Sequence, residues 1–422
     1  MKATGRGMGA NRMKRKLVVL AVVGVATLAA ACSSTPSGTA GKSGSTAKKF
    51  TIGILTDLTG LASTNNASVV QGVKAGIHWA ETQGYDFTYD TADTASNPSG
   101  VLPAMQKLVE QDHVFAVVSD SSLTFLNSTY LTQQGEPVVG IAEDGPEWIT
   151  APNMFSVVGP IDFKRVATTE GLILKNLGGT NVGTLGYGIS PSSAAAAEGT
   201  AASAEYEGLK VGYVNSNFSF GSTNVAPVVL AMQNAGVDAV SGSVESNTFY
   251  ALVNGLRDAG VKLKVVLSPT GYGGDLLNSG PGAIHAAKDV YFISPFEPFE
   301  MHTAATKAFQ SDLEAVGING DPTLGEYVGY TSIVLLVQGL KAAGSNPTQS
   351  DLIKALSNIK DFTGNGLFGS HSINFGDRTA TILGADDCYW ITQFNGSKFD
   401  LVHGMDPICG TIIPGKTISV SG

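Results

Sequence analysis

The side chains that most often perform catalysis are present in this sequence, but their spacing matches no catalytic motif. Neither a G-x-S-x-G nucleophile elbow nor an H-E-x-x-H metal motif occurs. The segment Gly186-Tyr187-Gly188 is similar to a dinucleotide loop, but Pro191 stands where the third glycine belongs. The six histidines are scattered along the chain: His78, His113, His285, His302, His371 and His403. We therefore expect no enzyme activity, no cofactor and no metal.

The amino terminus has the pattern of an export signal. Six basic residues precede an uncharged run at 17–31, and Ala29-Ala30-Ala31 stands directly before Cys32. A basic head, a short apolar run and small residues at the end are typical of a secretory signal, and the run is short for a membrane span. Cys32 after small residues resembles a bacterial lipobox, although Ala29 replaces the usual leucine. We expect a signal peptide at 1–31, lipidation of Cys32 and a Ser/Gly-rich tether at 32–49, with simple cleavage as the alternative.

The other two cysteines, Cys388 and Cys409, form a candidate pair. Export to an oxidising compartment favours a disulfide between them, and two buried thiols are the alternative.

The charge of the chain argues against nucleic acid as a partner. The full sequence has a net charge of −9, and removal of the six N-terminal basic residues leaves 20 basic and 35 acidic residues. An acidic protein repels phosphates instead of releasing their counterions.

Short apolar runs alternate with helical patterns along most of the chain. Strands are predicted at 50–56, 87–90, 114–119, 137–142, 182–187, 210–214, 239–241, 264–268 and 290–295. Helices are predicted at 68–80, 101–111, 123–133, 163–177, 192–206, 225–235, 248–258, 303–316, 323–343 and 348–358, and 373–418 has a β-rich pattern. Apolar strands between helices indicate parallel sheets covered on both faces, so the expected fold class is α/β with two doubly wound lobes.

Several segments, taken in order, resemble the type I periplasmic binding proteins of the leucine/isoleucine/valine-binding class. They are 50–60 (FTIGILTDLTG), 71–77 (QGVKAGI), 93–98 (DTASNP), 107–118 (KLVEQDHVFAVV), 135–140 (GEPVVG), 235–240 (AGVDAV) and 256–260 (LRDAG). The resemblance implies two Venus-flytrap lobes joined by three crossovers, lobe 1 at 50–161 with 296–372 and lobe 2 at 162–295 with 373–422. It also implies a monomeric solute-binding lipoprotein on the outer face of the cell membrane that serves an ABC permease. A sensor of the same fold and an exported enzyme are the alternatives.

The same resemblance implies a ligand site in lobe 1. The loop Ser119-Asp120-Ser121-Ser122 precedes a helix whose free N–H groups would attract an anion, with simple helix capping as the alternative for the serines. After the next strand, Ala142, Glu143 and Asp144 occupy ligand positions. Asp144 replaces a threonine of the family, so a carboxylate here suits an ammonium or hydroxyl group, unless it only caps the following turn.

Lobe 2 contributes the remaining candidates. Tyr187 ends a strand, Thr248 stands where amino-acid binders have an acid, and Glu245 is the nearest acid. Tyr272 and Phe296 lie near later strand ends and could line the cleft, although core packing is the common role of such aromatic residues. The implied solutes are branched-chain amino acids, amides or small aromatic acids.

Overall fold

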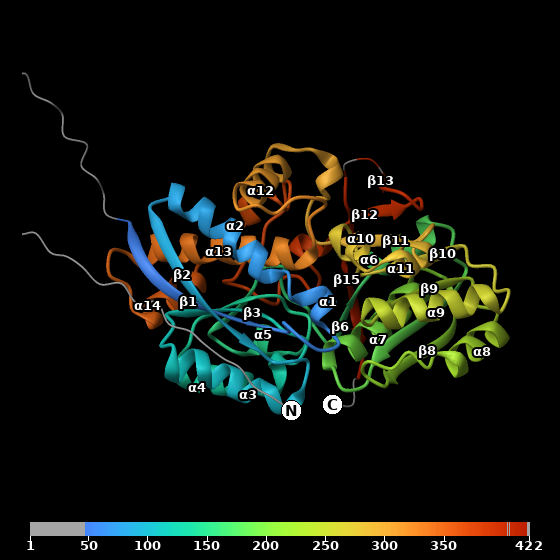
Figure 1. Cartoon of the computed structure of the whole chain (residues 1–422). Coiled ribbons are helices and arrows are strands. Elements are labelled where there is room, and N and C mark those ends of the chain that lie inside the picture. The colour runs from blue at the N-terminus through green and yellow to red at the C-terminus, as the bar shows by residue number, and fades with distance from the viewer. Residues whose placement is uncertain (1–46, 403, 405, 420–422) are drawn as a thin grey trace, which may run out of the picture. The chain divides into compact units, whose positions relative to one another are not determined.

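The computed structural model describes residues 47–402, 404 and 406–419, which form one parallel sheet, one mixed sheet and a small two-stranded sheet (Figure 1). The first sheet has the order β2-β1-β3-β4-β5 and is parallel throughout. Its strands are β1 Lys48–Thr56, β2 Tyr85–Asp93, β3 Ala116–Asp120, β4 Val138–Gly140 and β5 Met154–Ser156. This sheet and the helices on it are called the first lobe.

The second sheet has the order β13-β12-β11-β10-β9-β7-β8, and β14 pairs with β12. Its strands are β7 Asn181–Tyr187, β8 Lys210–Phe218, β9 Ala239–Ser243, β10 Val265–Ser268, β11 Tyr291–Ser294, β12 Cys388–Phe394, β13 Phe399–Val402 and β14 Ile408–Cys409. Strands β7 to β11 are parallel, whereas β12 runs antiparallel to β11. This second lobe therefore takes its last strands from the C-terminal part of the chain.

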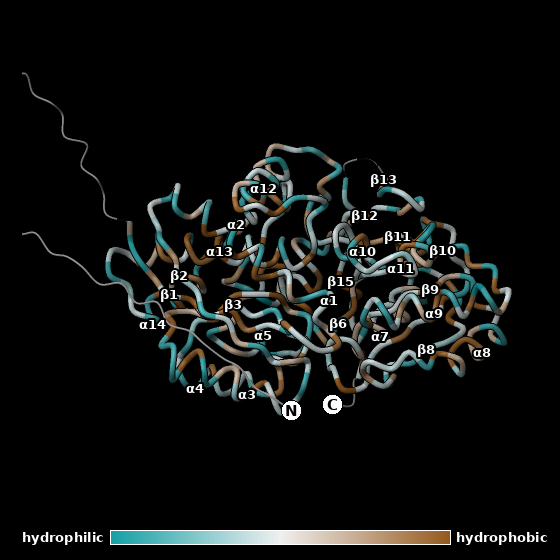
Figure 2. The backbone as a smooth tube through the Cα atoms, in the orientation of Figure 1, coloured by the Kyte–Doolittle hydropathy of each residue, from teal (hydrophilic) through white to brown (hydrophobic). Residues whose placement is uncertain are grey.

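Alternate residues of the strands enter hydrophobic clusters on opposite faces of each sheet. In the first lobe, Ile54 packs with helices α2 and α13, whereas Leu55 packs with α3 and α4. Figure 1 shows these two helix pairs on opposite sides of the sheet, and Figure 2 shows the apolar strands between them. The second sheet is covered in the same way, with α8 and α9 on one face and α6 and α7 on the other. The expected α/β class with doubly wound sheets is confirmed.

The helices of this architecture are α1 Ser63–Asn66, α2 Val69–Thr82, α3 Pro98–Gln106, α4 Ser128–Gln134, α5 Glu147–Thr150, α6 Thr169–Asn176, α7 Pro191–Tyr206, α8 Ala226–Ala235, α9 Ser246–Asp258, α10 Gly274–Asn278, α11 Pro281–Ala286, α12 Ala304–Ala315, α13 Leu324–Ala343 and α14 Gln349–Leu356. Helices α2 and α13 approach each other closely at two glycines. A Cβ on Gly72 would lie 2.1 Å from the Glu326 carbonyl oxygen, and one on Gly329 would lie 2.3 Å from the Val69 carbonyl oxygen. In the part of the chain that the structure describes, no helix has the length and apolarity that a membrane span requires.

The helix expected at 163–177 is only partly correct. Arg165–Ala167 forms strand β6, which pairs antiparallel with β15 Ile412–Thr417, and the helix α6 begins at Thr169. Pairing with a segment far along the chain overrides the local helical pattern. Strand β5 and the short helices α10 and α11 were not expected.

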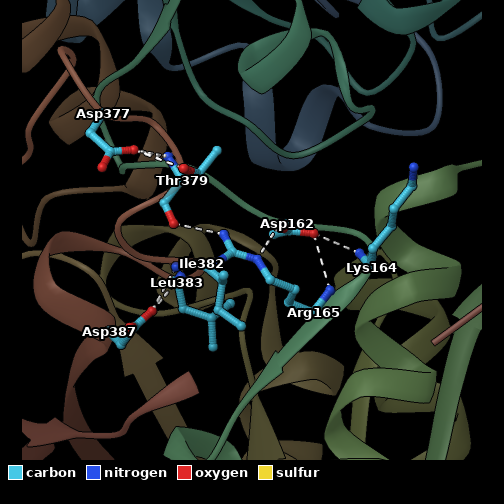
Figure 3. A network of polar contacts seen from close by, with 8 residues as sticks. All are labelled: Asp162, Lys164, Arg165, Asp377, Thr379, Ile382, Leu383 and Asp387. Carbon is cyan, nitrogen blue, oxygen red and sulfur yellow. Dashed lines mark hydrogen bonds and ion pairs between the residues drawn. The ribbon is translucent and has the colours of Figure 1, made fainter. Parts of the chain in front are cut away.

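The chain passes between the two sheets three times, after β5, after β11 and after α14. Figure 3 shows a polar network that joins the first and third of these passages. The Arg165 guanidinium donates to Asp162 Oδ2 at 2.6 Å and to the Thr379 carbonyl at 2.8 Å. Asp387 Oδ1 accepts from the backbone N–H groups of Ile382 and Leu383, each at 2.8 Å. This network fixes the two passages against each other beside the second sheet.

Cys388 and Cys409 form a disulfide in the structure. The two residues face each other in the antiparallel pair β12–β14, which places their side chains within bonding reach. Cys32 lies outside the residues that the structure describes.

Candidate ligand cleft

The carboxyl ends of the parallel strands of both sheets meet at two adjoining cavities. The smaller, of about 90 Å³, is lined by Asn65, Ser122, Leu123, Glu143, Tyr187, Ile189, Ser190, Ser193, Phe220, Ser243, Val244, Glu245 and Thr270. The larger, of about 150 Å³, shares Glu143, Ser243 and Thr270 with the first and has a mainly apolar wall. Ligand sites of α/β sheets commonly form at this edge. We call the two cavities together the cleft.

Asp57 organises the first-lobe wall of the cleft. It follows the last residue of β1, is fully buried, and accepts hydrogen bonds from five donors. Two of these donors are the Ser121 hydroxyl at 3.3 Å and the Ser122 N–H at 2.9 Å. The predicted serine loop is therefore held by a carboxylate that the sequence analysis did not single out. Ser119 lies deeper, where its hydroxyl pairs with that of Thr124 at 2.9 Å.

The short helix α1 places two asparagines against carboxyls from both lobes. Asn66 Nδ2 donates to Asp57 Oδ2 at 2.9 Å and to Glu143 Oε1 at 3.0 Å. Asn65 Nδ2 donates to Glu245 Oε2 at 2.6 Å, across the cleft. Neither asparagine was predicted as a site residue. Their signal, two amides in a polar turn shortly after the first strand, is common in ordinary loops.

Asp120 and Glu143 form a pair of neighbouring carboxyls. Asp120 ends β3, is 2% exposed and lines neither cavity. Burial, followed by the charge of Asp57, raises the pKa of Asp120 well above its usual range, while a hydrogen bond with Glu143 lowers it. Burial and the charge of Asp120 likewise raise the pKa of Glu143, which lines both cavities.

Asp144 points away from this pair. Its Oδ1 accepts from Trp148 Nε1 at 2.9 Å and from the Gly145 N–H at 3.1 Å, and its Oδ2 accepts from the Phe125 N–H at 2.9 Å. It is buried and lines neither cavity. These contacts favour the capping alternative for Asp144 over ligand contact.

The second-lobe wall is formed by Tyr187 and Glu245. The Tyr187 hydroxyl pairs with Thr248 Oγ1 at 2.8 Å and accepts from the Glu245 N–H at 3.2 Å. The Glu245 carboxyl faces Ser122 and Asn65 of the first lobe. Burial, followed by the charge of Asp57, raises the pKa of Glu245 to about 8. Thr248 thus positions the tyrosine, and Glu245 is the acid that reaches the cleft.

The remaining predicted residues have different positions. Ala142 lines the larger cavity. Tyr272 lies outside both cavities, where its hydroxyl accepts from the Phe299 N–H at 3.1 Å. Phe296 is fully buried and stacks on Tyr327, also outside the cavities. The structure brings Ser122, Glu143, Tyr187 and Glu245 together and leaves Tyr272 and Phe296 in the packed core.

Two lobes whose strand ends line a shared cleft are the arrangement found in proteins that bind a small molecule between two domains. A family model described as "Periplasmic binding protein" matches residues 49–398. The chain therefore belongs to the periplasmic binding protein family. Members of this family bind solutes outside the cytoplasm, and the family is not a family of enzymes.

Solved structures share the fold at low sequence identity. A leucine-binding protein, LivK, from Thermotoga maritima has a TM-score of 0.69 and 16% identity, covering 85% of this chain and 99% of that one. A solute-binding protein from R. palustris in complex with 4-hydroxybenzoate has a TM-score of 0.67 and 17% identity, covering 87% and 97%. LivJ from Streptococcus pneumoniae in complex with isoleucine has a TM-score of 0.66 and 18% identity, covering 87% and 99%. A comparison with curated proteins found no match.

Proposed function

We propose that this chain is the solute-binding protein of an ABC importer, which captures a small polar solute in the cleft and delivers it to a membrane permease. The observation that carries the proposal is the convergence of polar side chains from both sheets on one cleft, with Ser122 and Glu143 from the first lobe and Tyr187 and Glu245 from the second. The lobes that we propose are 50–161 with 296–372 and 162–295 with 373–422.

The proposed mechanism is a shift between open and closed arrangements of the lobes. Contacts between the lobes already exist at the cleft: Glu245 accepts from Asn65 at 2.6 Å, and the Ser192 N–H donates to the Asp144 carbonyl at 3.3 Å. A solute that contacts both walls only when they are together favours the closed arrangement by its difference in affinity for the two states. The permease would then recognise the closed form.

The test is a calorimetric screen of amino acids, amides, amines and small carboxylates, followed by X-ray scattering with the best solute. We expect saturable binding and a smaller radius of gyration in the bound state. Ser122→Trp should abolish binding, because the indole fills a cavity of about 90 Å³. Ser345→Trp, at an exposed loop position, is the matched control and should bind normally. Binding that survives in Ser122→Trp would refute this placement of the site.

We also propose that the protein is a monomer anchored to the outer face of the cell membrane through lipid on Cys32. The support is the small-residue run before Cys32 and the Ser/Gly-rich segment after it. Mass spectrometry of the N-terminal peptide should show the acyl mass, and Cys32→Ala should release the protein into the soluble fraction. An unmodified peptide from the membrane-bound protein would contradict the anchor.

A further inference from the structure

The larger cavity of the cleft is lined by all three passages of the chain between the sheets. Val158 follows β5, Pro295 follows β11, and Leu383 precedes β12. Under the proposed function these passages rotate as the lobes close, so the cavity has its present shape in one arrangement of the lobes only. A molecule held in this cavity therefore contacts the segments that join the lobes.

Most of the wall of this cavity is apolar. Its aliphatic members include Ile141, Val158, Ile161, Ile293 and Leu383, and its volume is about 150 Å³. A cavity of about this size with aliphatic walls can hold a benzene ring. The cavity therefore suits an apolar body of about the size of a single ring.

Thr184 on β7 presents a polar group to this apolar cavity. It lines the cavity and is 1% exposed, and its Oγ1 has no hydrogen-bond partner among the described residues. Side chains alternate along a strand, so Thr184 shares the sheet face of Val182, on which Ala197 and Thr200 of α7 also line the cavity. A buried hydroxyl without a partner costs free energy, and a polar group on a bound molecule would remove this cost.

The charges of the cavity wall favour an uncharged occupant. No basic side chain is among the residues that line either cavity, so a solute carboxylate would face Glu143 and Glu170 without a cation. An ammonium group is not favoured either, because Glu143 already accepts from Asn66, and Glu170 accepts from the Thr200 hydroxyl. Burial raises the pKa of both glutamates, which keeps their protons on. A charge of either sign would thus lose its hydration without gaining an ionised partner.

We propose that the solute of this cleft is an uncharged molecule with a hydroxyl group and an apolar body of about the size of a single ring. The proposal rests on the solute-binding function proposed above and narrows its class of solutes. The apolar body occupies the larger cavity, and the hydroxyl group bonds Thr184 Oγ1. Because the body contacts all three passages, its binding favours the arrangement of the lobes in which the cavity is formed.

Three matched probes test the proposal by calorimetry on the whole protein near neutral pH: benzyl alcohol, benzylamine and benzoate. Each has a benzene ring with a single carbon substituent, and they differ in charge. We expect benzyl alcohol to bind about 10-fold or more tightly than either charged probe, because burial of an unpaired charge is costly. Thr184→Val, which removes the hydroxyl and keeps the branched shape, should weaken benzyl alcohol about 3- to 10-fold and leave the fold intact. Thr392→Val is the matched control and should bind as the wild type does, because Thr392 Oγ1 is also buried without a partner among the described residues but lines neither cavity.

Each other outcome has a defined meaning. Equal or tighter binding of benzylamine or benzoate overturns the uncharged solute, and an unchanged affinity in Thr184→Val, or an equal loss in Thr392→Val, overturns the contact with Thr184. If benzyl alcohol does not bind but a charged compound from the wider screen does, the uncharged solute is overturned and the binding function stands. If the folded protein binds neither benzyl alcohol nor any compound in that screen, both proposals fail.

Discussion

Glu136 provides a direct test of how burial controls the charges of this protein. Its side chain is 2% exposed, Oε2 accepts from Gln349 Nε2 at 2.8 Å, and Oε1 has no partner among the described residues. Burial raises its pKa to about 7, while the hydrogen bond from Gln349 opposes the shift. In the unfolded chain the same carboxyl has a pKa near 4.3.

The sign of the effect on stability follows from proton binding. Below about pH 4 the carboxyl is protonated in both states, and between about 4 and 7 only the folded state keeps the proton. The contribution to stability is therefore complete at low pH and is lost as the pH rises through the folded pKa. The folded pKa of about 7 and the unfolded pKa of about 4.3 differ by about 2.7, which corresponds to about 3.7 kcal/mol over the full titration.

Glu136→Gln removes this titration and keeps an acceptor for Gln349. We expect the free energy of unfolding of the variant, minus that of the wild type, to increase by about 3 kcal/mol between pH 4 and pH 8. The assay is urea unfolding of both proteins at a series of pH values, and the subtraction cancels the other buried acids. A difference that does not vary with pH would refute the raised pKa of Glu136.

Three further predictions concern stability. Asp144→Ala should lower the free energy of unfolding by about 2 kcal/mol or more in urea, because three N–H donors lose their acceptor; an unchanged midpoint would contradict the capping role. Gly72→Ala should lower the melting temperature, because its Cβ would lie 2.1 Å from a backbone oxygen of α13, whereas Gly199→Ala, with nothing nearer than 3.8 Å, should not. Reduction of Cys388–Cys409, which are 21 positions apart, should cost about 3 kcal/mol in unfolding assays with and without a reductant. Equal stability of both redox forms would contradict that estimate.

Local patterns predicted the parallel sheets well because each buried strand is a short apolar run between helices. The expected strand at 50–56 lies within β1, and the expected helix at 192–206 begins one residue after the start of α7. The errors occur where distant segments pair. Strand β6 depends on β15, and β5 has only three residues at the edge of its sheet. A strand that forms by pairing with a distant segment has no local hydrophobic periodicity from which it can be predicted.

The candidate site could be predicted only in part. Glu143, Tyr187 and Glu245 stand at or just after strand ends and line the cleft, and their contact with a solute stays a prediction. Asn65 and Thr270 were missed because their place in the cleft depends on loop conformations. Asp144 and Glu143 are neighbours in the sequence, yet one caps a turn and the other faces the cavities.

The side-chain amides of the two asparagines of α1 occupy acceptor positions on the cleft acids Glu143 and Glu245. Asn66 supplies an N–H donor to Glu143, and Asn65 supplies one to Glu245, so each of these acids already has an amide donor from the protein. Under the proposed function, a solute that bonds these acids would replace the amide donors with its own, and its net affinity would be the difference between two sets of similar bonds. On the same basis, Asn66 can return to Glu143 when a solute leaves, because both lie in the first lobe, whereas the Asn65–Glu245 bond joins the lobes and is lost when they separate.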